Sequence, residues 1–422
     1  MQTNIIYPKI RVGKREIDFF PYWMGLLGLG VVFGLVGAFF VFRDGLQVTG
    51  LSNKIPWGLW ITIDLSSIAL GGSAFVFGAI VYLLQIKRFE VVGKLAVLLG
   101  FLGYSTAGMV LLMDLGQPLR FWHPIVYWQP HSLLWEVTMC VVLYLTVLVA
   151  ELVPVVTEHP HFESHPLQDR FPVLKALARF AKKLAGWLHS AGPVLAVVGM
   201  TLSLLHQASL GATYSVLYGR GVWFNQSAPT QFVFSAMSGG ISLLFILSVF
   251  VFRMMRPGMV KDDTFYDVAR LAGGVTLLLT YLRFWDWAVT NYYSFDKQIS
   301  LQTQLLDKVA PYSATFWLGQ ALFPVIAGVV LLYARQIKDF RYLIAAAVVP
   351  VFATVLTRWN YNFVGLIAAT TYDPYTPTVK LYSYSPTWVE FAVATLVISY
   401  WLIMFSLATR FLPFRGEHHH EH

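Results

Sequence analysis

Long apolar runs recur along the whole chain of 422 residues. Each run has about 18 residues or more, and in a helix that rises about 1.5 Å per residue this length crosses a hydrocarbon core of about 30 Å. Charged residues make up only 12% of the chain, against roughly a quarter in soluble proteins. Barrel strands would be about ten residues long and would alternate in polarity. The runs therefore predict an all-α integral membrane protein.

Ten of these runs are expected to be transmembrane helices. They divide the chain into a cytoplasmic N-terminal segment at 1–21, spans one to four within 22–156, a cytoplasmic connection at 157–190, spans five to ten within 191–409 and a cytoplasmic tail at 410–422. The expected spans are 22–42, 58–84, 95–113, 133–156, 191–217, 231–252, 268–290, 312–334, 342–369 and 387–409.

In two segments, the spacing of residue types predicts a helix with one distinctive face. In the second half of the 157–190 connection, leucines and alanines recur at helical spacing opposite lysines and arginines, which predicts an amphipathic helix at the membrane surface. In the first span, Gly30, Gly34 and Gly37 form a face of small residues. This face predicts close helix packing in preference to a dedicated dimer contact.

Lysine and arginine are distributed unevenly between the two sides of this arrangement. Of the 30 in the chain, 21 fall on the side of the termini, seven fall on the opposite side and two, Arg283 and Arg358, lie within spans. Because cytoplasmic loops retain positive charge, both termini are expected to be cytoplasmic. The net charge of +8 then reflects membrane topology, and no nucleic-acid partner is expected.

Residues that could hold a metal or a haem are few. Cys140 is the single cysteine, which excludes a disulfide within the chain and an iron–sulfur cluster held by cysteines. A b-type haem with two histidine ligands needs buried histidines on facing helices, and His206 is the only histidine deep within a span. We therefore expect no metal, haem or cluster on this chain, with a haem ligand from a partner as the alternative. The tail EHHHEH is expected to be a solvated end.

Ionisable side chains within spans mark candidate sites, because a charge at mid-membrane costs at least about 2.5–3.5 kcal/mol. In the first half of the chain, several of these side chains lie toward the outer side of the membrane, and loops on that side add further polar and aromatic residues. The candidate residues are Asp64 in span two, Glu136 in span four, His206 and Gln207 in span five, and Asp114, Trp60 and Trp122 nearby.

This combination of side chains suits a quinone. A quinone head takes up two electrons and two protons, so its site needs a hydrogen-bond donor that titrates near neutrality, and His206 is such a group. Asp64 and Glu136 could pass protons between the site and outer water, and aromatic side chains could hold the ring.

Each residue also has a structural interpretation. His206 could be a histidine whose hydrogen bonds join two helices, and Asp64 could pair with Ser67 or nearby backbone. Glu136 could be hydrated at the membrane interface. Tryptophans are common in the aromatic belts of membrane proteins, so Trp60 and Trp122 need not contact a ligand.

The second half of the chain has its own buried polar residues. Arg283 and Asp286 are three residues apart on one helical face and could neutralise each other as an ion pair. The competing interpretation is a proton path formed by Arg283, Asp286, Arg358 and Glu390.

Several motifs now bear on the family of the protein. The segments are PWGLWITID at 56–64, MDLGQPLRFWHP at 113–124, LLWEVTMCVVLY at 133–144 and LSLLHQASLGATY at 202–214. In this order and spacing, the chain resembles the NrfD/PsrC family of quinone-interacting membrane subunits. The likeness is greatest to the ten-span branch with HybB-like and DsrP-like members, and after residue 220 it is mainly topological.

The resemblance implies a fold and a function. Spans two to five and six to nine would form two four-helix bundles, flanked by the first and last helices. The first bundle would bind menaquinone or ubiquinone through His206, Gln207, Asp64, Asp114 and Glu136. The chain would serve as the quinone-reactive subunit of an oxidoreductase in a bacterial or archaeal inner membrane and would not be active alone.

The resemblance also implies partners. A ferredoxin-like iron–sulfur subunit would dock at the periplasmic face. A hydrogenase, a molybdopterin enzyme or a multihaem cytochrome c would complete the complex. Two other functions remain open at this point: a secondary transporter that uses the same buried charges, and a structural anchor that only holds a redox complex in the membrane.

Overall fold

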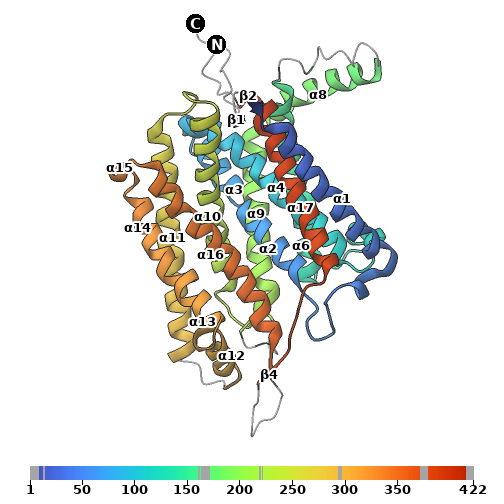
Figure 1. Ribbon diagram of the computed structural model, residues 1–422, viewed down its shortest axis with the longest axis vertical. Coiled ribbons are helices and arrows are strands. Elements are labelled where there is room, and N and C mark those ends of the chain that lie inside the picture. Colours follow the sequence, from blue (N-terminus) through green and yellow to red (C-terminus); the bar gives the residue numbers. More distant parts are fainter. Residues whose placement is uncertain are drawn as a thin grey trace.

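The computed structural model describes residues 9–12, 15–159, 162, 172–217, 220, 222–292, 297–370 and 379–414. Helices make up most of these residues and run side by side along the long axis of the molecule (Figure 1). Within the described ranges, nine helical segments are long and apolar enough to cross a membrane. The prediction of an all-α, multi-pass membrane protein is confirmed.

Four spanning segments form the first bundle, in which α2 and α3 pack on α4, α4 packs on α6, and α6 packs on α9. These are the second to fifth spans expected from the sequence. The segments are α2 (Leu59–Leu70) with α3 (Ser73–Gly78) and the π-helical turn η2 (Ala79–Leu83), α4 (Glu90–Asp114), α6 (Leu133–Thr157) and α9 (Gly192–Ser215).

The second bundle is built in the same way: α10 packs on α11 and α16, and α14 packs on α11 and α16. Its segments are α10 (Ala228–Ser248) with the π-helical turn η5 (Val249–Met255), α11 (Asp262–Tyr292), α13 (Tyr312–Ala314) with the π-helical η6 (Thr315–Leu322) and α14 (Phe323–Leu332), and α16 (Phe340–Ile367). The short helix α15 (Ala334–Ile337) joins α14 to α16, and α12 (Lys297–Lys308) precedes α13.

The expected span at 268–290 corresponds to α11. This helix has 31 residues and packs between α10 and α14 as a spanning helix would. It is not among the nine apolar segments, because charged residues within the helix, including Asp267, Arg270 and Arg283, lower its hydropathy. The count of ten spans therefore stays a prediction.

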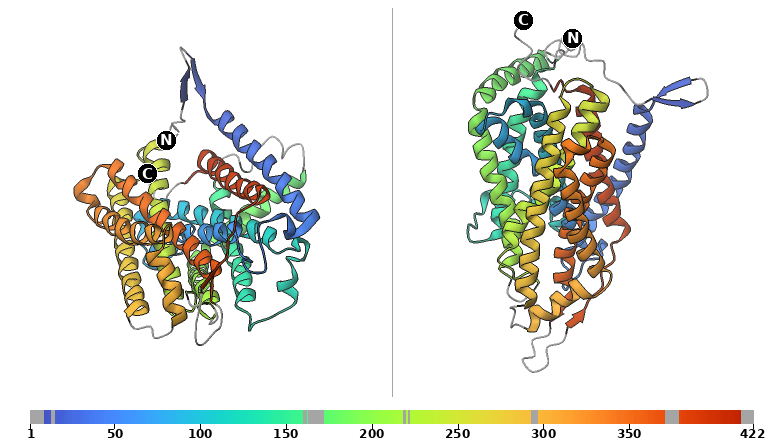
Figure 2. Two further views of the ribbon diagram at one scale, coloured as in Figure 1. Left: turned by 60° about the horizontal axis from the view of Figure 1, so that its bottom comes forward. Right: turned by 90° about the vertical axis from the view of Figure 1, so that its left-hand side faces the viewer.

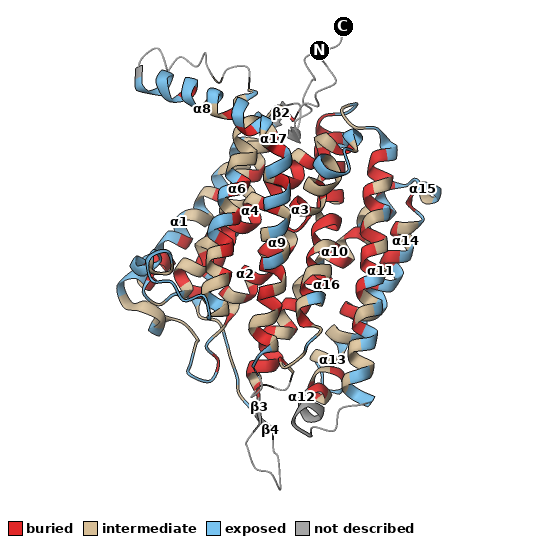
Figure 3. Ribbon diagram, turned by 180° about the vertical axis from the view of Figure 1, so that it is seen from behind, coloured by how far each residue is buried: buried red, intermediate tan, exposed pale blue. Residues whose placement is uncertain are grey.

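Glycines let helices approach closely, both within the first bundle and between the two bundles. The break between α2 and α3 falls at Gly71 and Gly72, and a Cβ atom at Gly72 would lie 2.8 Å from the carbonyl oxygen of Ala236 on α10. A Cβ atom at Gly103 on α4 would lie 2.5 Å from the carbonyl oxygen of Ser67 on α2. These glycines hold α2 against both α4 and α10, and buried residues follow the resulting core in Figure 3.

The first and last spans flank the bundles as a pair. α1 (Phe20–Asp44) packs along α17 (Trp388–Phe411), and α17 packs in turn on α4. Cβ atoms at Gly30, Gly34 and Gly37 would meet Ser399, Leu396 and Ala392 of α17 respectively. The small-residue face of α1 therefore packs within the chain, as predicted.

Replacing Gly34 by leucine is expected to separate α1 from α17. A Cβ atom at Gly34 would overlap Leu396 and lie 2.8 Å from the carbonyl oxygen of Ala392, so the helices must move apart. Overpacking of this kind costs about 1–3 kcal/mol, which should lower the melting temperature of the purified protein. Gly28→Leu is the matched control, because a Cβ atom there has no neighbour within 4 Å. Equal melting temperatures for the two variants would contradict the packing described here.

We call the end where α1 begins and α17 ends the inner end, and the opposite end the outer end, after the orientation expected from the sequence. At the inner end, α8 (Pro172–Ser190) lies across the bundle axis, and a hairpin of β1 (Lys9–Val12) and β2 (Arg15–Asp18) projects sideways (Figure 2). The turn η3 (Lys87–Phe89) also lies there. The outer end holds η1 (Gly45–Val48), η4 (Pro118–Arg120), α5 (His123–Val126) and the short sheet of β3 (Ala368–Thr370) and β4 (Val379–Leu381). The tail at 415–422 lies outside the described residues.

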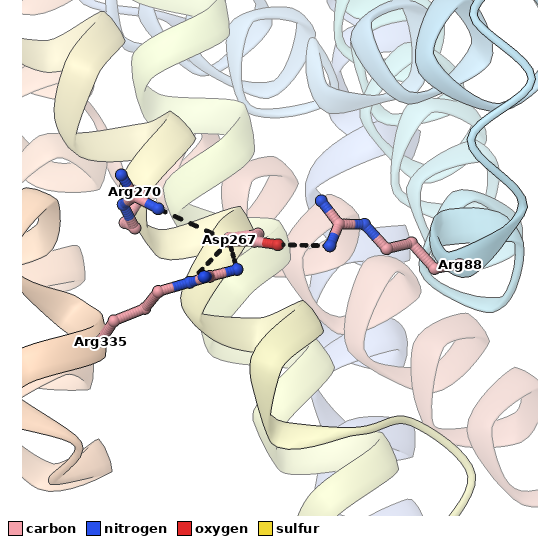
Figure 4. Close-up of polar contacts among 4 residues, drawn as sticks. All are labelled: Arg88, Asp267, Arg270 and Arg335. Carbon is pink, nitrogen blue, oxygen red and sulfur yellow. Dashed lines mark hydrogen bonds and ion pairs between the residues drawn. The ribbon is translucent and has the colours of Figure 1, made fainter.

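An ion cluster joins the two bundles at the inner end (Figure 4). The carboxylate of Asp267 on α11 lies 2.9 Å from Arg88 of the first bundle, 2.6 Å from Arg335 and 3.9 Å from Arg270. The Asp267 side chain is only 11% exposed, whereas its three arginine partners are about half exposed. The cluster fixes the relative positions of the bundles near the membrane surface.

Candidate functional site

His206 lies on α9 inside the first bundle and is completely buried. Its ring centroid lies 5.4 Å from that of Tyr104 on α4, and the backbone of Val137 on α6 approaches the ring without forming a hydrogen bond of normal geometry. Neither ring nitrogen has a hydrogen-bond partner in the described part of the chain. The structural interpretation of this residue, a histidine whose hydrogen bonds join two helices, has only the approach of the Val137 backbone in its support.

Gln207 is the neighbouring buried polar residue on α9. Its Nε2 donates a hydrogen bond of 3.1 Å to the carbonyl oxygen of Ile68 on α2, while its Oε1 has no described partner. Ile68 is about one turn of helix beyond Asp64, so this bond fixes α9 against the part of α2 that carries the predicted carboxylate.

Asp64 is buried on α2, and its Oδ1 has no described partner. Its closest charged neighbour in electrostatic terms is Asp114 at the end of α4, and it also interacts with Tyr104. The Ser67 hydroxyl donates to the Asp64 backbone carbonyl at 3.0 Å, and no bond from it to the carboxylate is formed. Asp64, Tyr104 and His206 thus belong to one buried polar cluster, which we call the first-bundle cluster.

Tyrosines that the sequence did not single out complete this cluster. The Tyr104 hydroxyl lies 3.4 Å from the hydroxyl of Ser203, and the Tyr104 and Tyr144 rings pack edge to face with centroids 4.6 Å apart. Both tyrosines are buried. A tyrosine in an apolar run looks the same in sequence whether it faces lipid, the membrane interface or a polar core, so no sequence signal identified them.

The other predicted residues of the first half lie toward the outer end, and not all of them are near this cluster. The carboxylate of Glu136 on α6 accepts a 2.7 Å hydrogen bond from Ser209, which is about one turn beyond His206 toward the outer end of α9. Trp60 is buried, and its indole nitrogen donates to the Glu390 carbonyl oxygen at 3.0 Å. Trp122 is 42% exposed and packs on His123 at the outer end, away from the buried cluster.

A groove within the membrane-spanning part reaches the same helix. It has a volume of about 430 Å³ and lies between α2, α4, α16 and α17. Its walls are apolar and aromatic, and Trp359, Trp401, Thr62, Ser66 and Thr106 are among the residues that line it. The groove gives α2 a surface suited to an apolar molecule.

Polar groups continue from the first-bundle cluster to the inner end. Glu151 on α6 is an electrostatic neighbour of Tyr144 and lines an inner cavity of about 310 Å³. Lys94 and Glu158 line the same cavity and form an ion pair of 3.1 Å. Polar side chains therefore occur at intervals across the whole first bundle, from Asp114 at the outer end to Glu151. Glu151 was not among the residues predicted from the sequence.

Glu390 anchors the outer end of α17. Its carboxylate accepts hydrogen bonds from the backbone nitrogens of Gly50 at 2.7 Å and Thr387 at 2.9 Å, and from the Tyr384 hydroxyl. With Thr387 it forms a capping box at the start of α17. Burial, followed by the hydrogen bond to Glu390, raises the pKa of the Tyr384 hydroxyl above its usual range. These contacts give Glu390 a structural role.

Replacing Glu390 by glutamine is expected to destabilise the outer end without slowing turnover of molecules that remain folded. The amide keeps one acceptor oxygen but puts an NH₂ group opposite backbone donors, and hydrogen bonds to a charged group are worth about 1.5–3 kcal/mol each. Thermal unfolding measures the loss, and activity is normalised to folded protein. Glu158→Gln is the control, since its carboxylate lies in a partly exposed ion pair. Slower turnover at unchanged stability would place Glu390 on a proton path.

Arg283 and Asp286 do not form the direct ion pair that was one of their two interpretations. No ion pair joins them within 4.0 Å in the described part, because the two side chains bind different elements. Arg283 donates to the Thr357 hydroxyl at 2.6 Å and to the Gln320 carbonyl oxygen at 3.4 Å. Asp286 accepts from Asn225 at 2.9 Å and Ser227 at 2.6 Å, in the segment that leads into α10.

Arg358 is fully buried on α16. Its guanidinium lies 3.6 Å from the ring centroid of Phe232 and donates to the Phe232 carbonyl oxygen at 3.0 Å. Arg283, Asp286, Arg358 and Glu390 thus have separate sets of partners, and their hydrogen bonds within the described residues do not link them into one chain.

Comparisons with known proteins bear on this arrangement. Residues 47–368 match the family described as "Polysulphide reductase, NrfD". The "Menaquinone reductase, integral membrane subunit" of Nitratidesulfovibrio vulgaris is 30% identical over 95% of this chain and 93% of that protein. A subunit of the selenate reductase of Mesobacillus selenatarsenatis is 24% identical over 92% of this chain and 93% of that protein.

A further relative comes from the hydrogenase systems. The "Probable Ni/Fe-hydrogenase 2 b-type cytochrome subunit" of Escherichia coli is 23% identical over 87% of this chain and 85% of that protein. The matches cover both bundles, so the resemblance found in the motifs of the first half extends to the second half. The chain therefore belongs to the NrfD polysulphide reductase family of multi-pass membrane proteins.

Proposed function

We propose that this chain is the membrane subunit of a respiratory oxidoreductase complex and binds a quinone or quinol, menaquinone in particular, in its first bundle. The observation that carries the proposal is the completely buried His206 ring, whose two nitrogens both lack a described partner. A buried polar group without a partner is costly, and a ligand that supplies the missing hydrogen bond removes the cost. The name of the relative from Nitratidesulfovibrio vulgaris, a menaquinone reductase, supports the ligand class.

The polar atoms of the first-bundle cluster fit a quinone head. A quinone supplies two-electron redox chemistry with uptake of two protons, and its oxygens accept hydrogen bonds as a quinone and also donate them as a quinol. His206 would donate to one oxygen, and the unpartnered Gln207 Oε1 and Asp64 Oδ1 would accept from a hydroxyl. Asp114 and Glu136 would connect the cluster to the outer end. Trp60 and Trp122, which the sequence also suggested for this site, contact Glu390 and His123 instead and are not part of the proposed pocket.

The chain would lie in the inner membrane with its outer end facing the periplasm. A periplasmic iron–sulfur subunit would bind to that end. Support comes from a group of large apolar side chains that are exposed between α4 and α6. Exposed apolar surface at a membrane protein's end suits either interfacial lipid or a protein partner. The group comprises Leu115, Leu119, Phe121, Trp122, Ile125, Val126, Tyr127 and Trp128.

The purified complex tests this proposal. We expect it to contain an iron–sulfur subunit and to transfer electrons between menaquinol and that subunit's partners. Cross-linking and mass spectrometry should join the iron–sulfur subunit to residues 115–128. A complex that assembles but shows no quinol-linked activity would indicate a structural anchor. A chain that moves a solute in liposomes without any partner would indicate a transporter.

Proton movement to the inner end would follow the polar groups of the first bundle. Tyr144 belongs to the first-bundle cluster and interacts electrostatically with Glu151, which lines the inner cavity. Replacing Glu151 by glutamine is expected to reduce quinol-linked proton release or uptake on the inner side of proteoliposomes at least about tenfold, because the amide cannot carry a proton. Glu158→Gln, in the same cavity, is the control. Unchanged proton movement in the Glu151 variant would remove this path.

We also propose that the chain holds no haem of its own. The name of the Escherichia coli relative includes "b-type cytochrome", which raises haem binding as an alternative. Among the histidines that the structure describes, His206 alone is buried, whereas a haem with two histidine ligands needs a second one. A reduced-minus-oxidised spectrum of the purified chain should lack a b-type α-band, and a stoichiometric band would overturn the proposal.

A further inference from the structure

The second bundle contains a cavity at its outer end, lined by apolar and several polar side chains, on the side of the molecule away from His206. The cavity has a volume of about 580 Å³ and lies between α11, α12, η6, α16 and the segment that precedes α10. Its lining includes Arg283, Asp286, Gln320 and Asn360. None of these residues takes part in the function proposed for the first bundle.

An apolar groove adjoins this cavity on the side of α11 and α14. The groove has a volume of about 530 Å³ and shares Arg283, Trp287, Phe316 and Gln320 with the cavity. Side chains along the groove, such as Phe284 and Leu322, are exposed on the membrane-spanning surface. The two spaces together offer a chamber with polar groups at one end and an apolar approach from the lipid at the other.

Four polar atoms around the chamber lack partners in the described part of the chain. They are Nε of Arg283, Nε2 of Gln320, Oδ1 of Asn360 and Oδ1 of Asp307. Arg283, Gln320, Asn360 and Asp307 are 8%, 6%, 3% and 7% exposed, so these are buried groups and water at an open surface does not explain them. Two are hydrogen-bond donors and two are acceptors, which is the set that a neutral head with carbonyl or hydroxyl groups would satisfy.

Local structure holds the site open. Residues 315–322 of η6 form π-helical turns, which widen the helix and are frequent at functional sites. The indole nitrogens of Trp287 and Trp317 donate to the side chain and the backbone of Asp307, at 3.2 Å and 2.9 Å. These bonds fix two aromatic rings, whose centroids are 5.1 Å apart, beside the junction of the chamber and the groove.

Depth and charge favour a neutral head over a phosphate. Gln320 lies eight residues from the start of α13 and Arg283 nine residues from the end of α11, so both lie about 12–14 Å below the outer helix ends. A phospholipid phosphate would have to leave the interface to reach them. The chamber also holds two carboxylates, Asp286 and Asp307, for its one guanidinium, so it does not attract an anion.

We propose that this chamber and groove form a second binding site for a quinone-class molecule, with the head beside Arg283 and Gln320 and the isoprenoid tail in the groove. Arg283 Nε and Gln320 Nε2 would donate to the head, and Asn360 would accept from it in the quinol form. The proposal takes its ligand from the membrane quinone pool on which the proposed function also rests. Its residues are separate from the first-bundle cluster, so the two sites can fail independently.

Photolabelling of the full chain in nanodiscs tests the second site. The probe is a menaquinone analogue that carries a diazirine on its head, and labelled peptides are identified by mass spectrometry. We expect label on residues 281–287 and 316–322 in the wild-type chain. Arg283→Gln should weaken this labelling about tenfold, the loss expected for one hydrogen bond to a charged group. Ala321→Trp, which fills the groove without touching the chamber's donors, should reduce it similarly.

Two matched variants separate this site from other effects. Arg270→Gln makes the same change on the same helix, in an ion pair at the inner end, and should keep the label on the second bundle. His206→Ala should also keep it while changing any label in the first bundle. Label on the second bundle alone would support the second site and overturn the location proposed for the first.

Three results would overturn the second site. They are the absence of label on residues 281–287 and 316–322, label there that neither Arg283→Gln nor Ala321→Trp reduces, and displacement by a phospholipid alone. The last result is measured by competition: excess menaquinone should displace the probe, and added phosphatidylglycerol should not. If the groove binds lipid instead, phosphatidylglycerol should displace the probe and menaquinone should not.

Discussion

Replacing His206 by alanine is expected to reduce quinol-linked activity of the complex at least about 100-fold while the complex still assembles. The ring is completely buried and makes no described hydrogen bond within the protein, so its removal leaves no protein partner unsatisfied. The loss should therefore appear in function and not in folding. Steady-state oxidation of menaquinol measures activity, and size-exclusion chromatography of the purified complex measures assembly.

His131→Ala is the matched control for this variant, because His131 is an exposed histidine of the outer segment between α4 and α6. Its activity should stay close to that of the wild type. Loss of the assembled complex in the His206 variant would show that the ring contributes mainly to packing against Tyr104, and full activity in an assembled complex would remove His206 from the quinone site.

Replacing Asp64 by asparagine is expected to lower kcat about 100-fold and to change quinone binding by less than about threefold. Asparagine keeps the shape and the hydrogen-bonding capacity of the side chain but cannot take up or release a proton. Asp64 is buried beside Tyr104, and Asp114 is its charged neighbour toward the outer end, so it is placed to pass protons between the cluster and water.

Asp44→Asn serves as the control for Asp64, since Asp44 forms a surface ion pair with Arg43 at the outer end of α1. Surface pairs contribute about 0–1 kcal/mol, so this variant should behave like the wild type. A weaker quinone affinity with unchanged kcat in the Asp64 variant would assign the carboxylate to binding. Unchanged values for both would remove Asp64 from the reaction.

Much of the fold could be predicted from hydropathy, because burial in lipid leaves few alternatives to helices. Gly30, Gly34 and Gly37 predicted the close packing of α1, which pairs with α17, and the two bundles follow the order of the spans. α11 was an exception, because its sequence is less apolar than those of the other spanning helices. Its charged residues are satisfied by contacts with other helices, such as the ion cluster at Asp267, and these contacts are invisible in a sequence.

The candidate site was predicted in part. Unusual residues in apolar runs, such as His206 and Asp64, could be recognised because each is costly unless it has a use. Tyr104 and Tyr144 could not be recognised in this way, because tyrosines are common in membrane proteins. The pairing of Arg283 with Asp286 was misjudged because helical spacing gives which side chains share a face, whereas the rotamers and the neighbours on η6 and α10 decide what each one binds.

The central claim is a quinone pocket in the first bundle, and a binding titration tests it most directly. A fluorescent menaquinol analogue is titrated against the purified chain and its His206→Ala variant, with Arg283→Gln in both backgrounds to reduce binding at the second site. We expect saturable binding that persists in Arg283→Gln and is lost when His206 is also replaced. Binding that the His206 substitution leaves unchanged, or no binding to the wild-type chain, would contradict the claim.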